Sequence, residues 1–185
     1  MGNGITQVAA CAGYQVTMID IQQEYVDRGI AAIEKSLAKL VSKERMTQED
    51  ADASRARISL SIDRGVCADC DLVIEAVPEI LDLKVSIFQE LDSICKPETI
   101  LASNTSSISI STIAEATNRP DKVIGMHFMN PVPIMKLVEI INGKATSEQT
   151  NATVIQASQQ MGKTALSCND SPGFVSYRIL CPMLN

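Results

Sequence analysis

Two patterns of apolar residues alternate along the chain. Short continuous runs predict strands buried in a sheet, and stretches in which apolar residues recur every three or four positions predict amphipathic helices. Strands are expected at 14–20, 58–62, 71–77, 99–103, 122–127, 135–141 and 163–168. Helices are expected at 2–13, 26–41, 83–94, 109–117 and 146–161, with further helical segments beginning near Thr47 and Ser171.

This alternation predicts an α/β fold with an open, mostly parallel, doubly wound sheet of the Rossmann type. The run 71–77 is almost wholly apolar, as expected of a strand that is covered on both faces. Thr47 and Asp50 have the spacing of a capping box, which predicts the start of a helix.

Both ends of the chain depart from the usual order of such a fold, which opens with a strand and a glycine-rich turn ahead of the first helix. Here Gly2 already begins the segment that reads as the first helix, and Gly13 is placed to end it. We therefore expect a doubly wound domain over 1–169 that lacks its first strand. The beginning of a helical second domain is expected at 170–185.

Composition narrows the classes of function. The 185 residues carry 16 basic and 22 acidic side chains, for a net charge of −6, and include no Trp, three Tyr and three Phe. With that charge and so few stacking platforms, binding to nucleic acid is not expected. No apolar run is long enough to span a membrane, so no membrane partner is expected either.

Six cysteines are scattered along the chain with no secretory signal ahead of them. They are expected to stay reduced, as in a cytoplasmic protein. Cys67 and Cys70 form a lone CxxC pair, and the chain has a single histidine to complete a metal site. No metal is therefore expected.

Two features suggest a dinucleotide cofactor. Gly2 and Gly4 at a helix start leave backbone N–H groups open to a pyrophosphate. Asp20 ends the next strand, where an acid can accept both ribose hydroxyls of an adenosine and repel a 2′-phosphate. No arginine directly follows Asp20, which favours NAD over NADP. The competing interpretation is an aspartate that only caps the turn after its strand.

A cluster of small polar residues, Ser-Asn-Thr-Ser-Ser at 103–107, follows an apolar strand. Open α/β sheets bind ligands at that edge. The cluster either hydrogen-bonds a polar group of a ligand or caps the helix that follows. The sequence leaves both interpretations open.

His127, the only histidine, ends a predicted strand, and Pro131 and Pro133 force an extended turn after it. The chain then returns as a strand that carries Glu139. This path can bring the carboxylate beside the imidazole, where it would fix the tautomer and stabilise the protonated form. A general base that takes a proton from an alcohol needs this arrangement. A buried His–Glu pair without chemistry is the alternative.

Three motifs resemble a known family. They are the cluster at 103–107, His-Phe-Met-Asn-Pro-Val-Pro-Ile-Met-Lys-Leu-Val-Glu at 127–139, and Asp-Ser-Pro-Gly-Phe at 170–174. They closely resemble the motifs of L-3-hydroxyacyl-CoA dehydrogenases, in particular the bacterial 3-hydroxybutyryl-CoA type, and the resemblance covers the whole chain. It implies NAD-dependent oxidation of a 3-hydroxyacyl-CoA to a 3-oxoacyl-CoA, or the reverse reduction, in fatty acid or butanoate metabolism.

The resemblance also implies roles for single residues. His127 matches the catalytic base and Glu139 the carboxylate that orients it. Ser106 and Asn130 match groups that contact the reacting part of the substrate and the nicotinamide. The other matched NAD contacts are Gly2, Asp20, Ala76, Val77, Glu79 and Lys84. The matched coenzyme A contacts are Ser106 together with Ser36 and Lys43, which are seven residues apart and so expected on one helix face.

Two positions depart from the family pattern. Only the third glycine of the fingerprint, Gly2, is present, and Tyr177 stands where the family usually has an active-site asparagine. An inactive gene fragment, or a remnant that binds NAD or CoA without turnover, is therefore an alternative to an enzyme. The resemblance further implies a homodimer formed through the helical domain. It also implies a cytoplasmic location, or the mitochondrial matrix if the source is eukaryotic.

Overall fold

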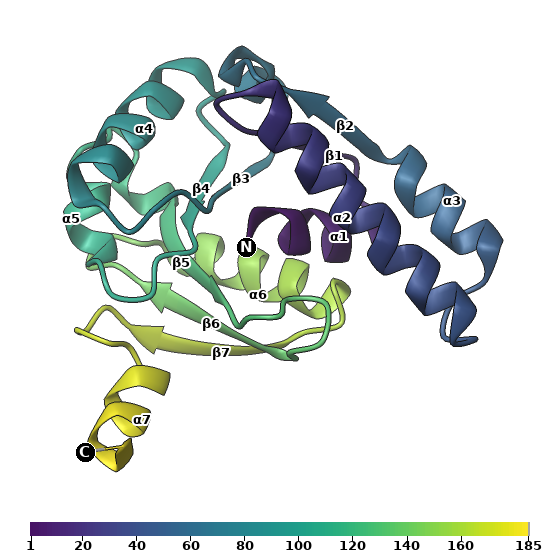
Figure 1. Cartoon of the computed structure of the whole chain (residues 1–185). Helices are drawn as coiled ribbons and strands as arrows, with labels where there is room; N and C mark the ends of the chain where they lie inside the picture. The colour runs from purple at the N-terminus through teal and green to yellow at the C-terminus, as the bar shows by residue number, and fades with distance from the viewer. Residues whose placement is uncertain (185) are drawn as a thin grey trace. The chain divides into compact units, whose positions relative to one another are not determined.

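A computed structural model describes residues 1–184, which group into two compact units. The first unit comprises Met1–Val66 together with the segment Asn130–Met135, and the second comprises Cys67–Met129 and the chain from Lys136 onward. The elements of both units are labelled in Figure 1.

The first unit combines three helices with a pair of parallel strands. Its elements are α1 (Gly2–Cys11), β1 (Val16–Ile19), α2 (Gln23–Ser42), α3 (Gln48–Ala56) and β2 (Ile58–Ser61). Helix α1 packs against β1, α2 and α3, and β1 pairs with β2. The apolar stripe predicted on α2 is buried, with Val26, Ile30, Ile33 and Leu37 in one cluster with Met18 and Ile58.

Both predicted helix boundaries in this unit are present. Gly13 has a φ of +98°, and its N–H donates to the Ala10 carbonyl at 3.1 Å, which closes α1 in the manner of a glycine C-cap. The Thr47 hydroxyl accepts from the Asp50 N–H at 3.0 Å and begins α3. In a full capping box the Asp50 carboxylate would accept from the backbone of Thr47, whereas here it accepts from the Thr47 hydroxyl at 2.7 Å.

The second unit contains a sheet of five strands in the order β3-β4-β5-β6-β7. Its strands are β3 (Leu72–Glu75), β4 (Ile100–Ser103), β5 (Val123–Phe128), β6 (Leu137–Asn142) and β7 (Thr164–Asn169). Its helices are α4 (Leu81–Ile94), α5 (Ile110–Ala114), α6 (Glu148–Gln160) and α7 (Ser176–Leu184), with a short 3₁₀ turn η2 (Pro120–Lys122). A further 3₁₀ turn, η1 (Arg64–Asp69), begins in the first unit and ends in the second. All neighbouring strands are parallel except β5 and β6.

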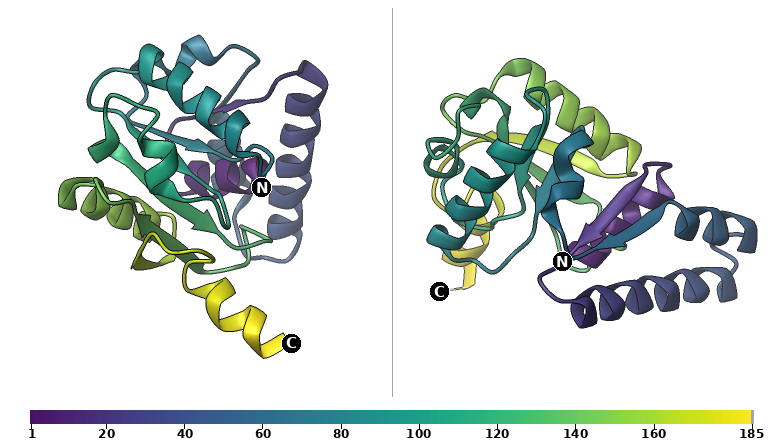
Figure 2. Two further views of the ribbon diagram at one scale, coloured as in Figure 1. Left: turned by 90° about the vertical axis from the view of Figure 1, so that its left-hand side faces the viewer. Right: turned by 90° about the horizontal axis from the view of Figure 1, so that it is seen from above.

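Helices cover both faces of the five-stranded sheet, as a doubly wound fold requires (Figure 2). Helices α4 and α5 lie on one face, and α6 lies on the other against β5, β6 and β7. Strand β5 is buried along its whole length because it lies at the centre of the sheet. Any polar side chain on β5 must therefore find its partners inside the protein.

The predicted α/β class is confirmed, and every expected strand is present within a few residues of its predicted bounds. Among the described residues the strands form two sheets, because β1 pairs only with β2 and β3 only with β4. One detail was wrong. The run 71–77 was expected to be covered on both faces, but β3 is an edge strand and only Glu75 on it is fully buried.

No helix within residues 1–184 combines the length and the apolar character that crossing a membrane requires.

Candidate active site

His127 on β5 and Glu139 on β6 stand directly opposite each other in the antiparallel pair. Their side chains are 5% and 0% exposed, and Nδ1 of His127 lies 2.8 Å from Oε2 of Glu139. The other ring nitrogen, Nε2, lies 3.0 Å from the hydroxyl of Ser106. The predicted pairing of His127 with Glu139 is thus present, and both imidazole nitrogens have defined partners.

The second oxygen of the Glu139 carboxylate is held by the backbone. Oε1 accepts from the N–H groups of Val175 and Ser176 at 3.1 and 2.7 Å. Burial by itself would raise the pKa of Glu139, but the hydrogen bonds from His127 and Ser176 outweigh it and lower that pKa. Glu139 is therefore ionised near neutral pH, and its charge keeps a proton on Nδ1 of His127.

Two aromatic rings flank the imidazole of His127. The ring of buried Phe174 is tilted against it with centroids 6.0 Å apart, and the ring of Tyr177 is nearly parallel to it at 6.2 Å. Tyr177 itself is 44% exposed. The residue that departs from the family pattern thus lies beside the candidate base.

The residues of the polar cluster at 103–107 make different hydrogen bonds. Ser103, Asn104, Thr105 and Ser107 form hydrogen bonds within the chain. Only the hydroxyl of Ser106 reaches the imidazole. Helix α5 is capped by Ser109, which lies outside the cluster, so the capping interpretation of these five residues was wrong.

A buried ion pair follows the end of β3. Lys84 is 1% exposed, and its Nζ lies 2.7 Å from Oε1 of Glu75 and 3.5 Å from Oε2 of Glu79. Sequence reasoning selected Lys84 and Glu79 but missed Glu75. The available signal was one acidic residue inside an otherwise apolar strand, because a carboxylate there needs a buried partner.

Glu79 connects the segments that follow β3 and β4. Its Oε1 accepts from the N–H groups of Ser106 and Ser107 at 3.0 and 3.1 Å and from the hydroxyl of Thr105. Burial would raise the pKa of Glu79, but the bond from Thr105 and the charge of Lys84 outweigh it and lower that pKa. Glu79 therefore fixes the backbone that carries Ser106.

Ala76 and Val77, two further predicted cofactor contacts, lie half-buried just beyond the carboxyl end of β3. The Val77 N–H donates to Glu75 at 2.6 Å, and the Val77 carbonyl accepts from Lys84 at 3.3 Å. The ion pair thus holds this strand end in place.

In the first unit, Asp20 is exposed at the end of β1 and lines an open pocket of about 430 Å³ with Asn3, Tyr25, Arg28 and Gly29. One carboxylate oxygen of Asp20 accepts from the next backbone N–H at 2.8 Å, so the capping role also holds. Although no arginine follows Asp20 directly, Arg28 reaches the same pocket from α2. Its guanidinium lies 4.7 Å above the centre of the Tyr25 ring.

The start of α1 and Asp20 together fit the adenosine diphosphate part of NAD. Met1 at the N-cap makes no side-chain bond to α1, and a Cβ added at Gly2 would meet no atom within 4 Å. The Gly4 N–H donates to Asn3 Oδ1 at 2.8 Å, so the N–H groups of Gly2 and Asn3 are the ones open to a phosphate. The nearby carboxylate suits a ribose diol. At Gly4 the packing is close, because a Cβ there would lie 2.9 Å from Cβ of Val132. The absence of a side chain at Gly4 thus permits this close packing, and its expected part in admitting a phosphate stays a prediction.

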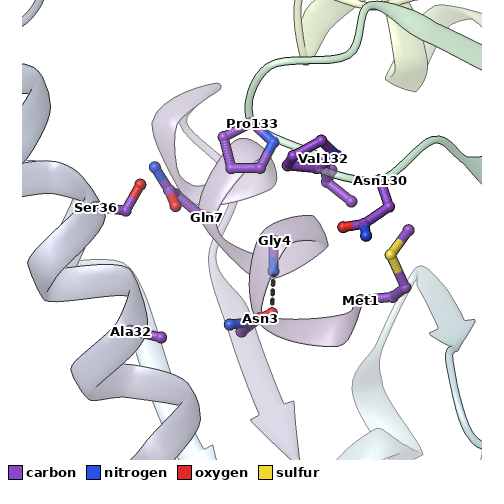
Figure 3. A pocket seen from close by; sticks show the side chains of 10 residues that line it. Met1, Asn3, Gly4, Gln7, Ala32, Ser36, Asn130, Val132 and Pro133 are labelled. Atoms are coloured by element: carbon purple, nitrogen blue, oxygen red, sulfur yellow. Dashed lines mark hydrogen bonds between the residues drawn. The ribbon is translucent and has the colours of Figure 1, made fainter.

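Two of the remaining predicted residues line one pocket. Ser36 on α2 and Asn130 both contribute to a pocket of about 240 Å³ in the first unit (Figure 3). Lys43 is exposed and follows directly after the last residue of α2. Asn130 belongs to the first unit, and Ser106, His127 and Glu139 belong to the second.

All six cysteines lie in the described part of the chain, and none forms a disulfide. Within the same residues no group of three His, Cys, Asp or Glu side chains is arranged to hold a metal ion. Burial raises the pKa of the Cys70 thiol, so Cys70 does not have the lowered pKa of a reactive thiolate.

A doubly wound domain, a glycine-led helix with a strand-end acid, and a buried His–Glu pair beside a serine together define the nucleotide-binding part of a dehydrogenase. Residues 1–171 match the family model described as 3-hydroxyacyl-CoA dehydrogenase, NAD binding domain. The chain belongs to this family.

Named relatives agree with this assignment. A probable 3-hydroxybutyryl-CoA dehydrogenase of Deinococcus radiodurans is 53% identical over the whole chain, and one of Bacillus subtilis is 50% identical. The crystal structure of (S)-3-hydroxybutyryl-CoA dehydrogenase from Ralstonia eutropha superposes with a TM-score of 0.98 at 48% identity over the whole chain, and the match covers 65% of that protein. The chain spans 66% and 64% of the lengths of the two curated relatives.

Proposed function

We propose that this chain carries the catalytic base and the cofactor site of an NAD-dependent 3-hydroxyacyl-CoA dehydrogenase, which oxidises the 3-hydroxyl of an acyl-CoA to a ketone or catalyses the reverse reduction. The observation that carries this proposal is the hydrogen-bonded series Ser106–His127–Glu139. A buried imidazole with a carboxylate on one nitrogen and its other nitrogen facing a hydroxyl has the geometry of a general base.

The proton on Nδ1 of His127 is held by Glu139, so Nε2 is the nitrogen that accepts a proton. Nε2 lies 3.0 Å from the Ser106 hydroxyl, and the substrate hydroxyl would take over this acceptor position when it binds. As His127 takes that proton, the buried charge of Glu139 stabilises the imidazolium. In the reverse direction the same imidazolium returns the proton to the ketone oxygen. NAD, when bound, supplies the acceptor for the hydride that leaves C3.

The binding roles follow from the resemblance and from the chemistry of each position. Gly2 and Asp20 would hold the adenosine diphosphate part of NAD, and Ala76, Val77, Glu79 and Lys84 its nicotinamide end. Ser36 and Lys43 would contact coenzyme A, and Asn130 the reacting group of the substrate. The neutral hydroxyl of Ser36 suits the middle of coenzyme A, and the exposed ammonium of Lys43 suits its phosphates.

We assign 1–169 to the NAD-binding domain and 170–185 to the beginning of a helical domain, through which two copies would associate. The turn at Val175 and Ser176 supports a direct link between the two segments, because its N–H groups bind Glu139. We propose a cytoplasmic location, or the mitochondrial matrix in a eukaryote, since six cysteines without a disulfide suit a reducing compartment.

The activity is tested by following NADH formation from (S)-3-hydroxybutyryl-CoA. His127→Gln keeps a hydrogen-bonding side chain but removes the base, so kcat should fall by about a hundred- to ten-thousand-fold while NADH affinity stays unchanged. Glu139→Gln should lower kcat less, because the imidazole remains. Hydride transfer at an unchanged rate in His127→Gln would exclude His127 as the base.

A second candidate is a domain that binds NAD or CoA without turnover. The ring of Tyr177 beside His127 favours it, because that ring occupies one side of the imidazole. NADH binding by the unaltered protein, with no oxidation of several 3-hydroxyacyl-CoA substrates, would support this candidate over the enzyme.

A further inference from the structure

Asp170 is a half-buried carboxylate that the proposed chemistry does not use. One of its oxygens, Oδ2, accepts from the Ser109 hydroxyl at 2.7 Å and from the Ser111 N–H at 2.8 Å. Burial by itself would raise the pKa of Asp170, but the hydrogen bonds from Ser111 and Ser109 outweigh it and lower that pKa. Asp170 is therefore ionised at neutral pH, and a charged acceptor strengthens both bonds.

The partners of Asp170 stand at the end of the loop that carries Ser106. This loop runs over 104–109, between the end of β4 and the start of α5. Glu79 holds its first half, where it accepts from the Ser106 N–H at 3.0 Å. Asp170 holds its last residue, Ser109, and the first turn of α5. The two carboxylates thus anchor the loop on both sides of Ser106.

The backbone of Asp170 is fixed to the sheet. Its N–H donates to the Asn142 carbonyl at 2.9 Å, at the last residue of β6. Helix α5 begins close to the same strand end, because a Cβ added at Gly143 would lie 3.4 Å from the backbone nitrogen of Ser111. The side chain of Asp170 therefore joins the start of α5 to the end of β6.

Asp170 also precedes the turn that leads to Glu139. The Phe174 N–H donates to the Ser171 carbonyl at 2.8 Å and closes this turn. Phe174 has a φ of +49°, a left-handed conformation that a residue with a side chain adopts only where its surroundings hold it. The N–H groups of the next two residues donate to Oε1 of Glu139. The segment that begins at Asp170 thus ends on the carboxylate that orients the imidazole.

We propose that Asp170 is a positioning residue for the candidate base, His127. It ties the loop that carries Ser106 to the turn that holds Glu139, and so keeps both partners of the imidazole in place. This inference rests on the proposed function, which makes His127 the base. A base has to face the substrate hydroxyl at hydrogen-bond distance, and small displacements from that geometry lower the rate.

The single histidine of the chain allows a direct test. In the full chain labelled with ¹⁵N-histidine, the NMR signal of Nε2 depends on the hydrogen bond from the Ser106 hydroxyl. Ser106→Ala gives the position of that signal without the bond. We expect Asp170→Ala to move the signal toward this position. Asp170→Asn keeps an oxygen that can accept both bonds, so its signal should stay near that of the unaltered protein.

Activity provides the second measurement. Asp170→Ala should lower kcat for (S)-3-hydroxybutyryl-CoA about ten- to a hundredfold, and Asp170→Asn should restore most of the rate. If Asp170→Ala does not fold, Ser109→Ala removes one of the two donors and should move the Nε2 signal part of the way.

Asp92→Ala is the matched control for a loss of stability alone. Asp92 also accepts a backbone N–H, that of Asn118 at 2.8 Å, but this residue follows α5 and does not belong to the loop 104–109. Asp92→Ala should therefore leave the Nε2 signal of the folded protein unchanged.

Three results would overturn the proposal. They are an Nε2 signal that stays in place in Asp170→Ala or in Ser109→Ala, an equal shift of that signal in Asp92→Ala, and a kcat that Asp170→Asn lowers as much as Asp170→Ala. Failure of the proposed function looks different. In that case the Nε2 signal still depends on Asp170, but the unaltered protein forms no NADH from (S)-3-hydroxybutyryl-CoA.

Discussion

The phenol ring of Tyr177 lies nearly parallel to the imidazole of His127, with 23° between the ring planes. The two backbone N–H groups just before it, at Val175 and Ser176, donate to the carboxylate of Glu139. The carboxylate that orients the candidate base therefore also holds the start of α7, and with it Tyr177, beside that base.

Replacing Tyr177 tests whether this ring hinders the reaction. Tyr177→Asn removes the ring and supplies the amide that the family usually has there, so we expect kcat/KM for (S)-3-hydroxybutyryl-CoA to rise about tenfold, the effect of one added hydrogen bond. Tyr177→Phe keeps the ring and should behave like the unaltered protein. NADH formation is the measurement, and equal rates in all three proteins would show that position 177 does not limit catalysis.

The buried ion pair of Lys84 and Glu75 is expected to contribute to the stability of the fold. Lys84→Met leaves the Glu75 carboxylate buried without its counter-charge, so the free energy of unfolding should fall by about 3–5 kcal/mol. Denaturation with urea measures it. The double variant Glu75→Leu with Lys84→Met removes both charges and should recover most of the loss. A double variant less stable than Lys84→Met would contradict this account.

Asp92 provides a prediction for the pH dependence of stability. Burial would raise the pKa of Asp92, but the hydrogen bonds from Asn118 and Arg119 outweigh it and lower that pKa. A carboxyl whose pKa is lower in the folded state contributes stability that is fully present above its usual pKa of about 4 and is lost as the pH falls through the folded value.

Asp92→Asn should therefore reduce the free energy of unfolding by about 2 kcal/mol at neutral pH, because Arg119 loses its charged partner. The difference between the variant and the unaltered protein should shrink as the pH is lowered from 5 to about 3. Thermal unfolding across this pH range measures the difference. The control is Asp71→Asn, which removes the exposed ion pair of Asp71 with Lys96 and should change the stability little. A difference that stays constant with pH would contradict the assignment.

The sequence predicted the elements of the fold because the apolar runs are clear. It predicted that the return of the chain after His127 can bring Glu139 beside it, and the register of β5 and β6 does so. It could not predict that β3 would be an edge strand with half-buried side chains. A strand lies at an edge when only one other strand pairs with it, and the local sequence does not record this. An apolar run such as Leu72 to Ile74 is compatible with an edge strand and with a central strand.

Single site residues were harder to predict when their partners lie far away in the sequence. Glu75 meets Ser103, 28 positions later, and Arg28 reaches the pocket of Asp20 from the side of a helix. Such contacts arise when distant segments pack together, and a sequence motif describes only residues that are close in the chain.

The charges around Asp20 make a prediction about cofactor choice. Asp20 should accept hydrogen bonds from the ribose of NAD and repel the 2′-phosphate of NADP, while Arg28 in the same pocket would attract that phosphate. Asp20→Ala should therefore weaken NADH binding about tenfold and bring the affinity for NADPH close to that for NADH, because the attraction of Arg28 is then no longer opposed.

In the double variant Asp20→Ala with Arg28→Ala, NADPH should again bind more weakly than in Asp20→Ala. Asp27→Ala, which removes a neighbouring acid that binds Gln23 outside the pocket, is the control and should leave both affinities unchanged. Fluorescence titration with each reduced cofactor measures the four proteins, and equal affinity for NADH and NADPH in the unaltered protein would refute the role given to Asp20.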